Sequence, residues 1–193
     1  MKYARLLGMV CLALALGSAN IFAQTVNDFT VWKHPVVANH PTLDFGVVIT
    51  EYKGSARTVT IPAVIDGSPV IGIGDFAFAG NTSITSVTIP SSVKGIGDYV
   101  FQGCTALTSV TLPVGITKIE NGAFSGCSSL RSMALPNSIT KIEDYAFQGC
   151  TSLASITLPS GRVKIDNTAF VGCPVISSAS QAAIRGLGYG GSF

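Results

Sequence analysis

A repeat of 23 residues constrains the fold of this chain more than any other feature of its sequence. Phenylalanine recurs at that interval five times, with glycine two positions later and, in the last four copies, cysteine directly after the glycine. The phenylalanines are Phe78, Phe101, Phe124, Phe147 and Phe170. Proline closes the stretch between them, at Pro90, Pro113, Pro136 and Pro159. A fixed period of this length predicts a solenoid, in which each turn buries its apolar face against its neighbours.

Each repeat contains one short segment that alternates apolar and polar residues. In one copy this segment is Val110-Thr111-Leu112, the pattern of a strand with one buried face. The proline that follows cannot donate to a ladder, so it ends the strand. The segment 98–104 and its equivalents show no alternation, and they predict a turn of helix that carries Phe and Cys into the core and ends at Gly103. Narrow strands on one side and wider helical turns on the other predict a curved stack with the strands on its concave face.

The repeat resembles a known family. The pattern Leu-x-x-Leu-x-Leu-Pro-x-x-Leu-x-x-Ile-x-x-x-Ala-Phe-x-x-Cys is matched from Leu107 to Cys127, and near-copies of it cover about residues 56–178. This pattern is similar to the BspA-like, treponemal type of leucine-rich repeat. The resemblance implies a leucine-rich-repeat solenoid of the α/β class, with short parallel strands on the concave face and helical turns or loops on the convex face. It also implies a surface or secreted protein, since members of this type are mostly of that kind, and several of them are implicated in adhesion to host proteins or matrix.

The two ends of the chain depart from the repeat. Residues 1–23 have the layout of a cleaved signal peptide: a positive start, an apolar run over 6–16, and small residues that place cleavage after Ala19 or Ala23. The apolar run is shorter than the roughly 20 residues that a membrane-spanning helix needs. The rest is expected to form one domain, composed of an N-terminal cap (24–55), a five-rung solenoid (56–178), and a C-terminal cap helix and tail (179–193).

The charge balance argues against a nucleic-acid partner. Of the 12 Lys and Arg residues, two lie in the signal peptide, which leaves ten against the ten Asp and Glu residues. A nucleic-acid-binding protein needs a basic excess to neutralise phosphates. No integral membrane segment is expected after signal cleavage. The expected localisation is therefore secreted, periplasmic or cell-surface.

Four cysteines remain after the signal peptide, and all occupy the same repeat position. An even number in an exported chain is compatible with disulfides. Strands in neighbouring rungs lie about 4.8 Å apart, however, and equivalent side chains in them point in the same direction. A disulfide requires the two side chains to point toward each other, so this arrangement disfavours one. Buried free thiols are therefore the favoured interpretation.

The candidate binding surface consists of the outward positions of the predicted strands, which we call the Ser/Thr face. Its small hydroxyl side chains suit docking to many partner geometries, although Ser and Thr also simply suit exposed strand positions. Arg131 is the one charge beside it, and the face lacks the Trp and Tyr residues that dominate many protein interfaces. The candidate residues are Thr58, Thr60, Ser86, Thr88, Ser109, Thr111, Arg131, Ser132, Ser155 and Thr157.

The N-terminal segment is chemically richer than the repeats. Trp32 is the only tryptophan, and it is expected to plug the first rung, with an aromatic anchor for a partner as the alternative. His34, His40 and Asp44 are potential metal ligands in type, but their spacing fits neither a helix nor a strand face, so no metal is predicted. The sequence also lacks the Gly-x-Ser-x-Gly, His-Glu-x-x-His and phosphate-loop motifs, so neither catalysis nor a cofactor is predicted.

These features predict an exported protein-interaction or adhesion module that binds a host or envelope protein through a shallow concave sheet. The alternative is a structural envelope protein that self-associates and has no foreign ligand. An enzyme is the remote third possibility, since the only two histidines are His34 and His40.

Overall fold

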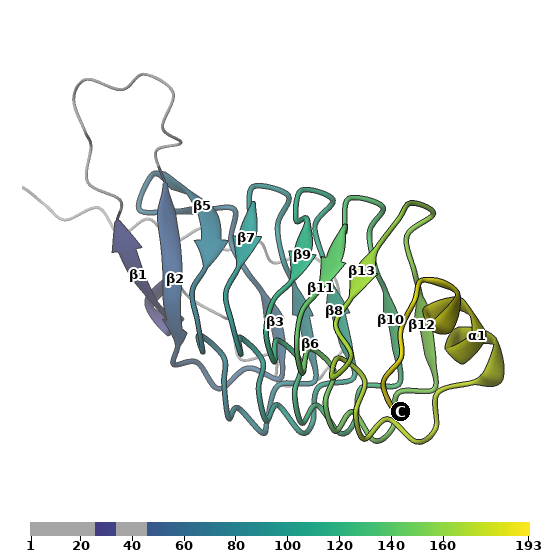
Figure 1. The fold of residues 1–193 in the computed structure, drawn as a ribbon. Coiled ribbons are helices and arrows are strands. Elements are labelled where there is room, and N and C mark those ends of the chain that lie inside the picture. The colour runs from purple at the N-terminus through teal and green to yellow at the C-terminus, as the bar shows by residue number, and fades with distance from the viewer. Residues whose placement is uncertain (1–25, 34–45) are drawn as a thin grey trace, which may run out of the picture.

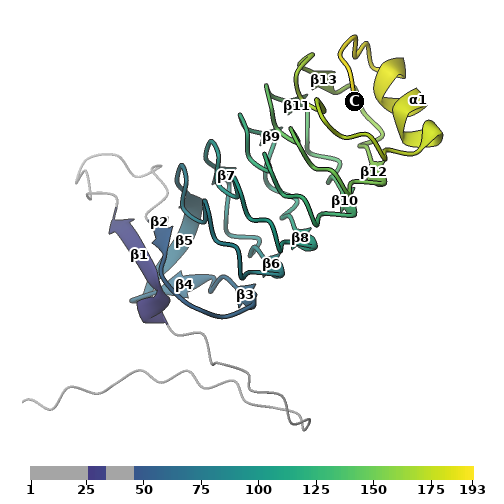
Figure 2. The same ribbon diagram turned by 90° about the horizontal axis from the view of Figure 1, so that it is seen from below.

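The computed structural model describes residues 26–33 and 46–193, which form a single stack of turns (Figure 1). One turn follows the next at the interval of the sequence repeat, and each contributes two short strands and one tight turn. The stack therefore has three walls: two ladders of parallel strands and a wall of hydrogen-bonded turns (Figure 2). The predicted leucine-rich-repeat solenoid is confirmed.

The first ladder contains the strands that the alternating segments predicted. Their middle residues, such as Val59 and Met133, point into the core, while most of the flanking side chains are exposed. The strands pair in parallel as β3-β6-β8 and as β10-β12. Their bounds are β3 Thr58–Thr60, β6 Ser86–Thr88, β8 Ser109–Thr111, β10 Ser132–Ala134 and β12 Ser155–Thr157.

The second ladder was not predicted. From β7 onward its strands are only two residues long, too short for alternation to show in the sequence, although each carries an isoleucine of the repeat. The strands pair in parallel as β2-β5-β7 and as β9-β11-β13. Their bounds are β2 Val47–Tyr52, β5 Ser68–Ile73, β7 Gly95–Ile96, β9 Lys118–Ile119, β11 Lys141–Ile142 and β13 Lys164–Ile165.

The third wall corrects the expectation of a helical turn in each rung. Within one such turn Ala79 N donates to Phe76 O, as in a single helical turn, but the next amide, Gly80 N, donates across to Gln102 O of the following rung. Because alternate amides pair with the neighbouring rung, the segment cannot continue as a helix. The glycine at the end of each turn has a φ near +70°, a conformation that glycine adopts without a steric penalty, as at Gly103.

The core is built around the repeated phenylalanines, which lie one above another. Ring centroids of successive residues from Phe78 to Phe170 are 5.2–5.5 Å apart, and all five rings are buried. Beside them the repeated cysteines are buried and free, as predicted. Each Sγ donates a hydrogen bond to a phenylalanine carbonyl of the preceding rung, as Cys127 does to Phe101 O at 3.1 Å.

The N-terminal end is covered by an antiparallel ribbon. The short helix η1 (Val26–Asp28) leads into β1 (Phe29–Lys33), which pairs with β2. Phe29 and Tyr52 extend the phenylalanine column, with ring centroids 5.3 Å apart, and Tyr52 stacks on Phe78 at 5.2 Å. Trp32 was expected to plug the first rung, and this is wrong: its side chain is 51% exposed, because Phe29 occupies the place over the column.

A hairpin and a helix complete the structure. A turn through Asp66 and Gly67, both of which have positive φ, joins β4 (Val64–Ile65) to β5. At the other end, α1 (Ser178–Gly186) packs against β12. The helix is capped by the side chain of Ser177, which accepts a hydrogen bond from Ser180 N. Tyr189 closes the phenylalanine column, with its ring centroid 5.7 Å from that of Phe170.

Candidate binding surface

The structure brings the predicted Ser/Thr face together. Parallel pairing places the first outward residue of each strand beside its equivalent, as in Ser86 beside Ser109, and does the same for the second, as in Thr88 beside Thr111. All ten candidate residues are exposed except Ser86, which is half-buried. Ala134 interrupts the second row, where the other strands carry threonine. The face is therefore two adjacent rows of small side chains, with Arg131 at their border.

The ladder beneath this face is not continuous. Thr108 N donates to Thr85 O at 2.8 Å and Ala154 N donates to Arg131 O at 2.9 Å. At the step between β8 and β10, in contrast, the equivalent bond from Arg131 N is absent among the described residues. Leu112 N also lacks the bond that Ile89 N makes to Thr111 O. We call this interruption the seam.

The seam opens a shallow apolar groove across the Ser/Thr face. The groove has a volume of ≈ 310 Å³ and is lined by Val110, Thr111, Leu112, Ala134, Leu135 and Pro136. Val110 and Leu112 are half-buried, and Val114, just beyond the strand, is 76% exposed. A surface that consists mostly of hydroxyl side chains therefore also offers an apolar contact at its centre.

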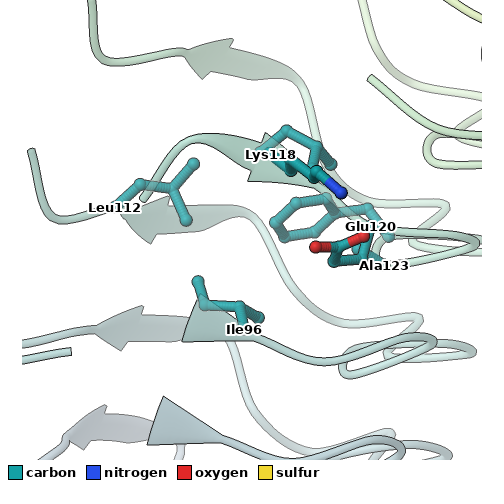
Figure 3. Close-up of a pocket in the computed structure, with 7 residues that line it drawn as sticks. Ile96, Leu112, Lys118, Glu120 and Ala123 are labelled. Atoms are coloured by element: carbon teal, nitrogen blue, oxygen red, sulfur yellow. The ribbon is translucent and has the colours of Figure 1, made fainter. Parts of the chain in front are cut away.

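A second interruption lies on the adjacent wall, between β7 and β9. Glu120 N and Thr117 N lack the bonds to the preceding rung that Glu143 N and Thr140 N make. A crevice of only ≈ 10 Å³ lies there, and its lining includes Ile96, Leu112, Lys118 and Glu120 (Figure 3). Leu112 lines both the groove and the crevice, so the two interruptions meet at this residue.

The buried cysteines have no access to a reactant. Burial raises the pKa of the Cys104 thiol to about 11, and burial also raises the pKa of Cys127. Their sulfur atoms therefore stay protonated at neutral pH and act as hydrogen-bond donors to the backbone. Within the described ranges no group of three or more His, Cys, Asp or Glu side chains has a geometry that holds a metal. His34, His40 and Asp44 lie outside the described residues.

The sequence analysis missed a row of aromatic side chains on the turn wall. Phe76 and Tyr99 occupy the same repeat position, and their rings stack with centroids 5.1 Å apart and an interplanar angle of 8°. Tyr145 lies in the same row and is 41% exposed, as Phe76 is at 55%. The available signal was the spacing of 23 residues from Phe76 to Tyr99, and of twice that from Tyr99 to Tyr145.

Comparison with known families agrees with the geometry. The model of the "BspA type Leucine rich repeat region" matches residues 69–186 in six copies. This stretch is more than half of the chain, so the chain belongs to the BspA-type leucine-rich-repeat family. Six copies is one more than the five phenylalanine-centred rungs.

Solved structures of similar proteins share the fold. The leucine-rich-repeat protein of T. pallidum (TpLRR) is 29% identical with a TM-score of 0.60, and the match covers 88% of this chain and 98% of that one. A leucine-rich cell surface protein from Faecalibacterium prausnitzii is 28% identical with a TM-score of 0.68, covering 84% of this chain and 42% of that one. A comparison with curated protein sequences finds no match. In the part of the chain that the structure describes, no helix is long and apolar enough to cross a bilayer.

Proposed function

We propose that this protein is an exported interaction module that binds a host or envelope protein through the Ser/Thr face. The observation that carries the proposal is the in-register array of exposed hydroxyl side chains, crossed at its centre by the apolar groove. Hydroxyl groups both donate and accept hydrogen bonds, and the groove provides apolar area that can be buried. Membership in a family of interaction modules supports the same reading.

Binding at this face requires no chemical step. Its side chains are small and uncharged apart from Arg131, and no candidate nucleophile with a neighbouring base lies on it. Five strands at about 4.8 Å span only about 24 Å, so one copy covers a modest interface. We expect weak binding per copy, strengthened when many copies are held on one surface. Export is supported by the signal-like residues 1–23 and by the F. prausnitzii protein, which is described as a cell surface protein.

The proposal is tested by adding charge to the face. The full chain is used to capture proteins from solubilised host matrix and from bacterial envelope. We expect the double variant Thr111→Glu with Thr157→Glu to lose the captured partner at least ten-fold, because a buried carboxylate without a counter-ion opposes docking. The matched control is Gln102→Glu with Thr151→Glu, which adds the same charge to exposed positions of the turn wall. Equal capture of the partner by both double variants would show that the binding site lies outside the Ser/Thr face.

The alternative is self-association in the envelope, in which a second copy of the chain covers the Ser/Thr face. The apolar groove across this face and the exposed Val114 beside it offer apolar area that a second copy can bury. Light scattering decides between the two functions: a stable homo-oligomer that is disrupted by Thr111→Glu with Thr157→Glu favours self-association over adhesion.

A further inference from the structure

A ladder of ion pairs follows the second strand ladder. Strands β9, β11 and β13 each place a lysine two residues before a carboxylate, and the lysines of β9 and β11 reach the carboxylate of the next rung. Lys118 Nζ lies 3.8 Å from Glu143 Oε1, and Lys141 Nζ lies 3.4 Å from Asp166 Oδ2. Each of these carboxylates therefore receives a cation from the rung that precedes it.

Glu120 is the exception, because the preceding rung has glycine at the ladder position, and Lys94 beside it donates to Ser91 O instead. The equivalent position is Gly95, and the Glu120 carboxylate makes no hydrogen bond or ion pair with any other residue in the described ranges. Lys118 is on the same strand, but its ammonium lies in the direction of Glu143. A Cβ atom added at Gly95 would meet nothing within 4 Å, so a side chain can begin at this position without a clash.

The surroundings of Glu120 favour a counter-ion with an apolar stem. Burial raises the pKa of Glu120, and the charged groups that act on it are Lys118, Glu143, Asp98 and Lys141, two cations against two anions. The half-buried side chain of Ile96 lines the same crevice from the preceding rung, and Figure 3 shows it opposite Lys118 and Glu120. Lysine packs its methylene groups along apolar surface while its ammonium reaches a carboxylate.

We propose that the corner formed by Gly95, Ile96 and Glu120 binds a lysine side chain of a partner protein, which supplies Glu120 with the cation that glycine at the ladder position of the preceding rung does not provide. The site lies on the second strand ladder, on the wall adjacent to the Ser/Thr face, and does not depend on the function proposed for that face. The site contributes a single charge-assisted contact. Such a contact adds little affinity, and its main effect is to favour basic partners over neutral or acidic ones.

The test uses a lysine tetrapeptide as the probe, with a glutamine tetrapeptide as the neutral control, at low salt. The full chain, labelled with ¹³C in its carboxyl groups, is titrated with each peptide. We expect the lysine peptide to shift the Glu120 carboxyl resonance saturably and to lower the pKa of Glu120, because a nearby cation favours the ionised form. Glu143 is already paired and is expected to respond much less.

Two variants decide the proposal. Gly95→Lys supplies the missing lysine from within the chain, so it should lower the pKa of Glu120 without peptide and weaken the peptide response at least ten-fold. Gly95→Gln fills the same space without a charge and should retain the fall in the Glu120 pKa on addition of the peptide. Glu120→Gln should also abolish the specific binding. The proposal is overturned if Glu120 and Glu143 respond alike, or if Gly95→Lys responds as the parent does.

Discussion

At the scale of single residues, one repeat position carries backbone strain. Phe76, Tyr99 and Tyr145 have φ of 58°, 54° and 58°, and Gly122 has 56° at the equivalent position. The left-handed region costs a bulky residue roughly 1–2 kcal/mol, whereas glycine adopts it freely. The stacked rings of Phe76 and Tyr99 offset part of this cost, because such pairs contribute roughly 0.5–1.5 kcal/mol.

Tyr145 tests this balance, because it stacks on no other ring among the described residues. We expect Tyr145→Gly to increase the free energy of unfolding by about 0.5 kcal/mol, since the relief of strain exceeds the entropy that glycine adds to the unfolded chain. Tyr99→Gly should be neutral or destabilising, because it also removes the stack on Phe76. Urea unfolding of the two variants measures the difference, and equal losses of stability would show that the strain is absent.

At the scale of elements, α1 replaces the rung that would have followed β12. Ile184 is fully buried, and Ser180 Oγ accepts a hydrogen bond from Ile156 N at 3.3 Å, the amide of the middle residue of the last strand of the ladder. Terminal repeats of a solenoid need such a cover, since otherwise their apolar faces and backbone groups are exposed. A helix suits this place because its side-chain hydroxyl supplies the acceptor that a further strand would have supplied.

We expect Ser180→Ala to lower the free energy of unfolding by about 1–2 kcal/mol, because it leaves the buried Ile156 amide without its partner. Ser178→Ala is the matched control in the same helix. Its side chain is exposed, so the variant should change stability by less than about 0.5 kcal/mol. Thermal and urea unfolding compare the two. If both substitutions have the same effect, α1 is not closing the ladder through Ser180.

At the scale of the whole molecule, the stack is continuous on one wall and interrupted on the other two. On the turn wall, backbone bonds join every rung from Phe78 to Phe170, as in Phe101 N to Ala123 O and Phe124 N to Ala146 O. The strand walls open between β8 and β10 and between β7 and β9. A solenoid is stabilised by the interfaces between neighbouring turns, so the seam is a weak internal boundary.

Hydrogen exchange of the native protein measures how readily the backbone opens at the seam. We expect the amides of Leu112 and Arg131 to exchange at least ten-fold faster than those of Leu135 and Thr108, which occupy equivalent positions and donate to the neighbouring rung. Phe101 and Phe124 amides, on the turn wall, should remain protected on both sides of the seam. Uniform protection of all these amides would show that the ladder is continuous in solution.

The sequence predicted most of the repeated features because each depends on contacts between identical positions. Once the period is known, the Phe column, the buried thiols and the alternating strand at Val110-Thr111-Leu112 follow, since each residue packs against its own copies. The second strand ladder did not follow, because a two-residue strand such as β9 has no alternation of its own and depends on hydrogen bonds to its neighbours. The prediction that Trp32 covers the first rung failed for a similar reason. Which aromatic side chain of β1 is buried depends on which one faces the phenylalanine column, and that residue is Phe29.

By itself the sequence determined the family, the axis of the stack and the residues that line the core and the Ser/Thr face, because a strict period allows only equivalent environments for equivalent positions. Only the tertiary structure decided where that equivalence fails. The seam, the unpaired Glu120 carboxylate and the exposure of Trp32 each depend on the packing between particular neighbouring turns or at the end of the stack. Those contacts vary from rung to rung even where the repeated residues do not, and the surfaces proposed here for binding lie at two of these irregularities.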